Sequence, residues 1–314
     1  PFLVQPVATL HASPSAAMQA FTRTAQSSVV CCNLQRSRTR SQVRSRVVAM
    51  AQGKVEPAVI IGGGRVGQAL KDMGVEGDVI VRRGEAFPTT PATGPIFVAT
   101  RNDVLEDVIK NTPEHRREDL VFMQNGMLQP FLDAQGLGKN TQALIYFAVA
   151  ALGEKPTDGV TDVNPEGLTA VTGKWADAVA ARFHNGDLSC HVLDAKTYEA
   201  SMFEKLIWIS AMMLVGAQHE GSKVGDVAST YKDEVVALIE ELLAGTSACA
   251  GAKFTPGAVE RLLGYARQVA HFPCGVKEFA WRNGFFYGLS EEAMKNGKPD
   301  PFPTHTRLLK NINA

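Results

Sequence analysis

Cysteine is scarce in this sequence. The 314 residues contain five cysteines, of which Cys31 and Cys32 lie near the N-terminus and Cys190, Cys249 and Cys274 are scattered through the rest. The last three form no CxxC pair, no zinc-ligand spacing and no even disulfide framework, and the histidines form no spaced cluster. We therefore expect reduced, mostly buried thiols and no metal site.

Long apolar runs and an excess of one charge are also missing. The longest strongly apolar, uncharged stretch, residues 206–218, has 13 residues, whereas a membrane-spanning helix needs about 20. This stretch predicts a buried helix and no membrane span. Lys+Arg and Asp+Glu both number 32, so the net charge gives no reason to expect nucleic acid or an anionic membrane as a partner.

Acidic residues are absent from residues 1–48, which carry six arginines and are rich in Ser, Thr and Ala. This composition, without the apolar run of a secretory signal, predicts a disordered transit peptide over residues 1–50. The segment 46–51 resembles a stromal processing site, so we expect the chloroplast stroma, with the mitochondrial matrix second. Met18 resembles a natural start of such a peptide, which would leave residues 1–17 untranslated. An ordinary disordered basic tail is the alternative.

Strand and helix patterns alternate from Pro57 onward. Predicted strands lie at 58–61, 78–81, 96–99, 120–123, 143–150, 168–171 and 188–192. Alternation of this kind predicts a parallel sheet with helices on both faces. After Asp194 the strand signals stop, and helices are predicted at 196–219, 231–249, 256–270 and 276–296. The predicted fold is α/β: a Rossmann-type domain over 55–193, followed by an all-helical C-terminal domain over 194–314.

A glycine-rich turn follows the first predicted strand. It contains the GxGxxG pattern immediately before a helical segment, which is the context that dinucleotide binding requires. The first glycine permits the tight turn, the second lets the backbone approach a pyrophosphate, and the third lets the helix pack on the strand. The predicted cofactor-binding residues of this turn are Gly62, Gly63, Gly64, Arg65, Val66 and Gly67.

Two arginines, Arg82 and Arg83, follow the second predicted strand, and Arg82 comes 20 residues after Gly62. An NAD site usually carries Asp or Glu there, whereas an NADP site needs cationic donors for the 2′-phosphate. A guanidinium can bind that phosphate with two hydrogen bonds. NADP is therefore the predicted cofactor, and two solvated strand-end arginines are the alternative.

From about Pro57 to Ile312 the chain resembles the ketopantoate reductase family. Four segments in order carry the resemblance: the glycine turn with Arg82, Met123-Gln124-Asn125-Gly126-Met127, Phe203-Glu204-Lys205-Leu206, and Glu278-Phe279-Ala280-Trp281-Arg282-Asn283-Gly284. The resemblance implies an NADPH-dependent reductase of a small 2-oxo acid or related ketone. It implies that Lys205 polarises and protonates the carbonyl oxygen, that Glu278 positions the substrate or assists the proton, and that Asn125 orients nicotinamide or substrate.

The chain also departs from this family. Family positions that hold the substrate are here Ile209, Met213 and Ala266, and an aspartate two residues after the glutamate is Ala280. A lysine after the third strand is replaced by Arg101, which we keep as a predicted cofactor-binding residue. These departures cast doubt on ketopantoate as substrate and favour a more apolar one, or none.

Simpler explanations exist for each predicted catalytic residue. Lys205 could be a solvated lysine at a helix end, Asn125 an ordinary Asn-Gly loop residue, and Glu278 the partner of Arg282 in a helical i,i+4 pair. The alternative function is accordingly an NADP-binding protein that has lost turnover and serves as a sensor or assembly partner. The expected partner is a small carbonyl substrate, and a homodimer or larger assembly stays open.

Overall fold

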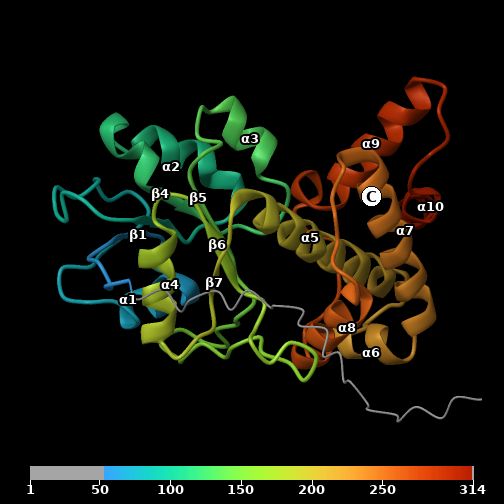
Figure 1. Cartoon of the computed structure of the whole chain (residues 1–314), viewed down its shortest axis with the longest axis horizontal. Helices are drawn as coiled ribbons and strands as arrows, with labels where there is room; N and C mark the ends of the chain where they lie inside the picture. The colour runs from blue at the N-terminus through green and yellow to red at the C-terminus, as the bar shows by residue number, and fades with distance from the viewer. Residues whose placement is uncertain (1–52, 313–314) are drawn as a thin grey trace, which may run out of the picture. The chain divides into compact units, whose positions relative to one another are not determined.

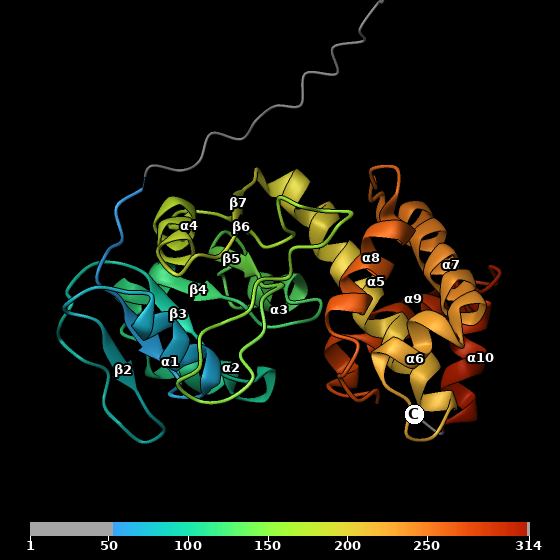
Figure 2. The ribbon, with the colours of Figure 1, turned by 90° about the horizontal axis from the view of Figure 1, so that it is seen from below.

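The computed structural model describes residues 53–312, which belong to one compact unit. The predicted transit peptide, its processing site and the Met18 start lie outside the described residues. Figures 1 and 2 show a sheet-containing half and a helical half, with the long helix α5 (Ala195–Gln218) leading from the first into the second.

The sheet has seven strands in the order β2-β1-β3-β4-β5-β6-β7. Their bounds are β1 (Val59–Ile61), β2 (Val79–Val81), β3 (Ile96–Val98), β4 (Leu120–Phe122), β5 (Thr141–Leu144), β6 (Ala170–Thr172) and β7 (His191–Val192). The first five pair in parallel, and β6 runs antiparallel to β5. The sheet is therefore mostly parallel, as predicted, but not entirely so.

Alternating side chains on the strands bury both faces of the sheet. On one face Ile60 and Val121 pack with α1 (Arg65–Asp72) and α4 (Ala176–Asn185). On the other face Val59 packs with the second layer of helices. That layer contains α2 (Leu105–Asn111) and α3 (Gln129–Ala134), with short 3₁₀ turns η1 (Asn102–Val104) and η2 (Glu114–Asp119). Helices on both faces of a parallel sheet are what the alternation predicted.

The helical half packs around α5. The Asp194 side chain caps this helix by accepting hydrogen bonds from the backbone N–H groups of Lys196 and Thr197 at 3.1 and 3.0 Å. The surrounding elements are α6 (Val224–Ser229), α7 (Lys232–Ala250), α8 (Ala258–Gln268), η3 (Phe279–Trp281), α9 (Asn283–Lys295) and α10 (Pro303–Asn311). By length and composition α5 could cross a membrane, but 78% of its most apolar stretch is buried in the protein, which is typical of a core helix.

Two predicted elements differ most from the structure in their extent. The strand predicted at 143–150 ends at Leu144, because the backbone N–H of Tyr146 donates to the Thr169 side chain at 3.1 Å and no longer to a neighbouring strand. The helix predicted at 276–296 begins only at Asn283. Glu278 adopts a left-handed backbone with φ of 49°, which is incompatible with a right-handed helix. Both departures lie near predicted site residues.

Candidate functional site: a dinucleotide cleft and a buried lysine

A cleft of about 1000 Å³ opens at the carboxyl ends of β1, β2 and β3. Ligands bind at this edge in open α/β sheets. The lining includes nearly all the predicted cofactor-binding residues, namely Gly62, Gly63, Gly64, Arg65, Val66, Arg82, Arg83 and Arg101. The structure therefore brings together residues that are up to 39 positions apart in the chain.

The three glycines of the turn have different surroundings. Gly62 has φ of 110°, and a Cβ atom there would lie 2.4 Å from the Ala99 carbonyl oxygen. At Gly67 a Cβ would lie 1.8 Å from the Gly62 carbonyl oxygen, so these two glycines are required by the fold. Gly64 faces open space, with no atom within 4 Å of its Cβ position. Helix α1 begins just after it with no side-chain cap, so its first N–H groups are free to bind a pyrophosphate.

Several charged groups line the cleft beside these glycines. Arg82 and Arg83 are exposed, as the arginines of a 2′-phosphate site would have to be. Glu85, to which the sequence analysis gave no role, also lines the cleft. Its carboxylate accepts the backbone N–H of Arg82 at 2.6 Å, and this bond turns the carboxylate back onto the chain. Arg101 pairs with Asp103 at 3.0 Å on the surface.

Arg65 reaches from the glycine turn to the segment that follows β5. Its Nη1 donates to the carbonyl oxygens of Val149 and Ala150 at 3.1 and 3.0 Å. These bonds occupy one of its nitrogens and leave other N–H donors of the guanidinium for a phosphate. The cleft residues thus fit a dinucleotide cofactor: backbone donors at the glycines, with four cationic side chains around them.

Asn125 lies in the turn after β4, at the same edge of the sheet. The buried side chain of Asn102 donates to the Asn125 carbonyl oxygen at 3.2 Å. The neighbouring Gln124 side chain donates to the carbonyl oxygens of Val98 and Thr100 at 2.8 and 3.2 Å. These bonds fix the turn to the end of β3. Asn102 and its bond were missed by the sequence analysis, since an Asn opening a short 3₁₀ turn has no distinctive pattern.

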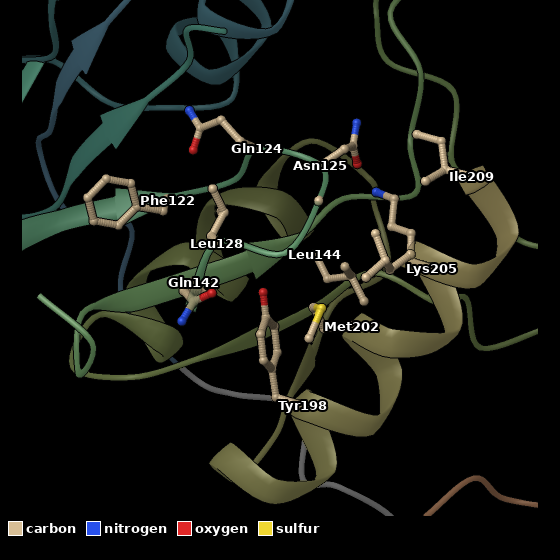
Figure 3. Close-up of a pocket in the computed structure, with 12 residues that line it drawn as sticks. Phe122, Gln124, Asn125, Leu128, Gln142, Leu144, Tyr198, Met202, Lys205 and Ile209 are labelled. Carbon is tan, nitrogen blue, oxygen red and sulfur yellow. The ribbon is translucent and has the colours of Figure 1, made fainter. Parts of the chain in front are cut away.

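Lys205 lies in the same small pocket as Asn125 (Figure 3), and its side chain extends from α5 toward the Asn125 turn. It is only 6% exposed. Its Nζ donates to the backbone carbonyl oxygen of Ile145 and lies 4.7 Å from the centre of the Tyr146 ring. The adjacent Glu204 does not neutralise it, because that carboxylate pairs with Arg261 at 2.5 Å. The alternative of a solvated lysine is therefore wrong.

The electrostatic surroundings of Lys205 favour its neutral form. Burial, assisted by the positive charge of Arg282, lowers the pKa of Lys205 from 10.5 to about 7. A lysine with this pKa holds its proton loosely at neutral pH. Such a group can donate the proton to a developing alkoxide, because general acids work best when their pKa is near the working pH.

Glu278 and Arg282 form a salt bridge across a tight turn, and their side chains are 24% and 12% exposed. Glu278 has a left-handed backbone, and the 3₁₀ turn η3 lies between it and Arg282. The two residues therefore do not form a solvated i,i+4 pair on an α-helix. The turn docks on the Asn125 segment, because the Trp281 carbonyl oxygen accepts the backbone N–H of Met127 at 2.7 Å. Glu278 therefore lies close to the pocket but not in its lining.

The pocket around Lys205 is small and largely apolar. Its cavity of about 10 Å³ has room for about one water molecule. The apolar lining includes Leu144, Met202 and Ile209, and Ile209 is one of the diverged family positions. Met213 and Ala266 occupy the other diverged positions but do not line the pocket. Within residues 53–312 no group of three or more metal-ligating side chains comes together.

No protein-family model matches this chain, and no curated protein matches it. Solved structures match its backbone. A PanE/ApbA family ketopantoate reductase from Ralstonia eutropha JMP134 aligns with a TM-score of 0.58 at 15% identity, over 82% of this chain and 97% of its own. The fold is that of the ketopantoate reductases.

Two further structures share the ketopantoate reductase fold. A dimeric ketopantoate reductase from Staphylococcus aureus aligns with a TM-score of 0.53 at 17% identity, over 82% of this chain and 99% of its own. A ternary structure of D-mandelate dehydrogenase with NADH and anilino(oxo)acetate aligns with a TM-score of 0.55 at 13% identity, over 82% and 100%. At these identities the likeness establishes the ketopantoate reductase fold alone. The reaction has to be argued from the residues of the site.

Proposed function

We propose that this protein is an NADPH-dependent reductase that converts a small 2-oxo acid or related ketone to the corresponding alcohol. The observation that carries the proposal is Lys205: a buried amine whose hydrogen-bond partner is a carbonyl oxygen and whose pKa is about 7. It shares a pocket with Asn125, at the sheet edge where the dinucleotide cleft also opens. A lysine of this kind has no evident structural purpose, because burying an unpaired cation destabilises a fold.

The residues present can account for the reaction. The nicotinamide cofactor, when bound, supplies the hydride that adds to the carbonyl carbon. Lys205 hydrogen-bonds the carbonyl oxygen and gives it a proton as negative charge develops there, which balances the reduction to an alcohol. The Ile145 carbonyl oxygen aims the ammonium group, and Asn125 supplies an amide that orients nicotinamide or substrate. Glu278 positions the substrate hydroxyl or assists the proton from beside the pocket.

Preference for NADPH rests on the strand-end arginines. Arg82 and Arg83 are exposed in the cleft, whereas the nearby Glu85 carboxylate accepts the backbone N–H of Arg82. A carboxylate held in this way is a poorer partner for a ribose 2′-hydroxyl, and the two guanidinium groups suit a 2′-phosphate. We infer that Gly62, Gly63, Gly64, Arg65, Val66, Gly67 and Arg101 complete the NADP site.

The substrate we favour carries a larger apolar group than ketopantoate. Ile209 occupies a position where the ketopantoate reductase family has a polar substrate-holding residue, and Met202 and Leu144 extend the apolar lining. D-mandelate dehydrogenase, which shares the fold, has been captured with anilino(oxo)acetate, an aromatic relative of a 2-oxo acid. This precedent supports an aromatic or branched 2-oxo acid.

A panel of 2-oxo acids and ketones, screened by the loss of NADPH absorbance, tests the proposal. We expect turnover with at least one bulky 2-oxo acid and little with ketopantoate. The absence of turnover across the panel, together with tight NADPH binding, would favour the alternative of an NADP-binding sensor or assembly partner. The small volume of the Lys205 pocket, about 10 Å³, is the observation that supports this alternative.

Compartment and assembly are further proposals. The acid-free, arginine-rich composition of residues 1–48 supports import into the chloroplast stroma, with the mitochondrial matrix second. Mass spectrometry of the protein from its source should find an N-terminus near residues 49–52, and a mature chain that retains Arg23 would contradict this. The dimeric Staphylococcus aureus enzyme of the same fold supports a homodimer, which light scattering would detect.

A further inference from the structure

Arg282 is a half-buried cation to which the family resemblance assigns no role. It links η3 to α9 and is 12% exposed at its side chain. On one side, the preceding residue Trp281 bonds the turn that bears Asn125. On the other side, Phe285 packs against Phe203 of α5 with ring centres 5.9 Å apart, two residues before Lys205. Arg282 therefore lies between the two elements that carry the proposed catalytic groups.

The hydrogen bonds of Arg282 are incomplete. Its Nη2 pairs with the Glu278 carboxylate, but its Nε–H is buried and has no partner among the described residues. A guanidinium has five N–H donors, and a buried donor without an acceptor destabilises the protein. Such a donor in a native protein calls for an explanation, and a ligand that completes the set is one.

The balance of charged groups around the pocket also favours a bound anion. Arg282 and, when protonated, Lys205 contribute two cationic groups, against the single carboxylate of Glu278. The other nearby carboxylate, Glu204, is already neutralised by Arg261 through two hydrogen bonds of 2.5 and 3.1 Å. The positive charge of Arg282 helps to lower the pKa of Lys205. Two neighbouring cations in a desolvated site repel each other, and a bound anion would relieve the repulsion.

We propose that Arg282 determines substrate specificity by binding the carboxylate of an anionic substrate. This inference rests on the proposed reductase function, because it concerns the carboxylate next to the carbonyl group on which Lys205 acts. In a 2-oxo acid the carboxylate is bonded directly to the carbonyl carbon, so the groups that bind the two must be neighbours. Arg282 thus replaces a substrate contact that the chain lost at Ala266, and the apolar part of the substrate extends toward Ile209.

The test measures binding of anilino(oxo)acetate and of its uncharged methyl ester by calorimetry, with NADPH at saturation. The variants are Arg282→Met and Arg282→Lys, and the control is Arg267→Met, an exposed arginine in a surface ion pair with Asp162. We expect Arg282→Met to weaken the acid about 10- to 100-fold, the usual range for a charge-assisted hydrogen bond. The ester should be unaffected. Arg282→Lys should restore part of the affinity, and the control should match the unmodified protein.

A second variant separates ligand binding from a structural role. Glu278→Gln removes the carboxylate that competes for Arg282, so it should tighten binding of the acid several-fold. If Arg282→Met weakens acid and ester equally, or if the unmodified protein does not bind the acid, the inference is overturned. Arg282-dependent binding of the acid without reduction of any 2-oxo acid would refute the reductase function and leave the inference standing. Reduction of uncharged ketones by a protein that does not bind the acid would overturn the inference about Arg282 and leave the reductase function standing.

Discussion

The two parts of the candidate site differ in how they are built. The dinucleotide cleft has a volume of about 1000 Å³ and is lined by a glycine turn and by exposed arginines at strand ends. The Lys205 pocket has a volume of about 10 Å³ and is lined by side chains from β4, β5 and α5, up to 87 positions apart in the chain. The cleft uses local backbone geometry, whereas the pocket uses long-range burial. Local geometry is therefore enough to shape the cleft, but perturbing the pKa of a lysine requires a folded core.

The largest expected effect comes from removing the perturbed group. Lys205→Ala should reduce turnover on the true substrate about 100- to 10,000-fold, the usual contribution of a positioned general acid. NADPH affinity should change little, because Lys205 does not line the dinucleotide cleft. Steady-state kinetics and NADPH fluorescence titration measure both quantities. Lys196→Ala, at an exposed position in the first turn of α5, is the matched control. Normal turnover in Lys205→Ala would reduce the resemblance to one of fold alone.

The pH dependence of the reaction should follow the pKa of Lys205, which is about 7. Reduction needs the protonated amine, so kcat should be level below pH 7 and fall about tenfold per unit above it. Oxidation of the alcohol product needs the neutral amine and should show the opposite trend. Rate profiles from pH 5 to 9 in both directions test this prediction. A reduction rate that rises from pH 7 to 9 would exclude Lys205 as the proton donor.

The glycines of the cleft should separate cofactor binding from folding. A methyl group at Gly64 meets no atom of the protein, and its φ of −78° suits alanine. Gly64→Ala should therefore fold normally but weaken NADPH about tenfold or more, because the methyl occupies the approach to the phosphates. Gly67→Ala should instead lower the melting temperature, since its methyl clashes with the Gly62 carbonyl. Unchanged NADPH affinity in Gly64→Ala would mean that the cofactor binds elsewhere.

Cofactor choice should depend on the strand-end arginines. The unmodified protein should bind NADPH at least ten times more tightly than NADH, equivalent to about 1.4 kcal/mol. Arg82→Ala should weaken NADPH about tenfold and leave NADH nearly unchanged, so NADH serves as the internal control. Titration with both cofactors measures the ratio. Equal affinities in the unmodified protein would contradict the prediction.

The last expected effect is a gain in stability. The folded-state pKa of Lys205, about 7, lies below its ordinary value of 10.5, so the unfolded state binds more protons between these pH values. Below pH 7 the full penalty of burying the charge destabilises the protein, and stability rises as pH increases from 7 to 10.5. Lys205→Met should raise the free energy of unfolding at pH 7 by on the order of a few kcal/mol. Equal urea midpoints for the two proteins would contradict this.

Sequence patterns predicted the local features well and the site geometry only in part. The GxGxxG turn, the strand ends with their arginines and the apolar helix α5 all lie where the pattern indicated. Each leaves a recognisable pattern within a few consecutive residues. The predicted start of the last helix at 276 was wrong, because the left-handed break at Glu278 is supported by docking on the distant 125–127 turn. The role of Glu85 was missed for a local reason: its bond to the Arg82 backbone depends on the turn conformation.

The sequence alone determined the class of fold and the place of the glycine-lined cleft, because period-two and helical apolar patterns and glycine conformational freedom act over short distances. Only the tertiary structure decided which ionisable groups are chemically unusual. In the sequence, Lys205 is an ordinary lysine beside a glutamate. The fold makes it unusual because it buries Lys205, pairs Glu204 with Arg261 and brings Arg282 close. A pKa depends on solvent exclusion and on charges from every neighbouring element, and these exist only once the sheet and the helices have packed together.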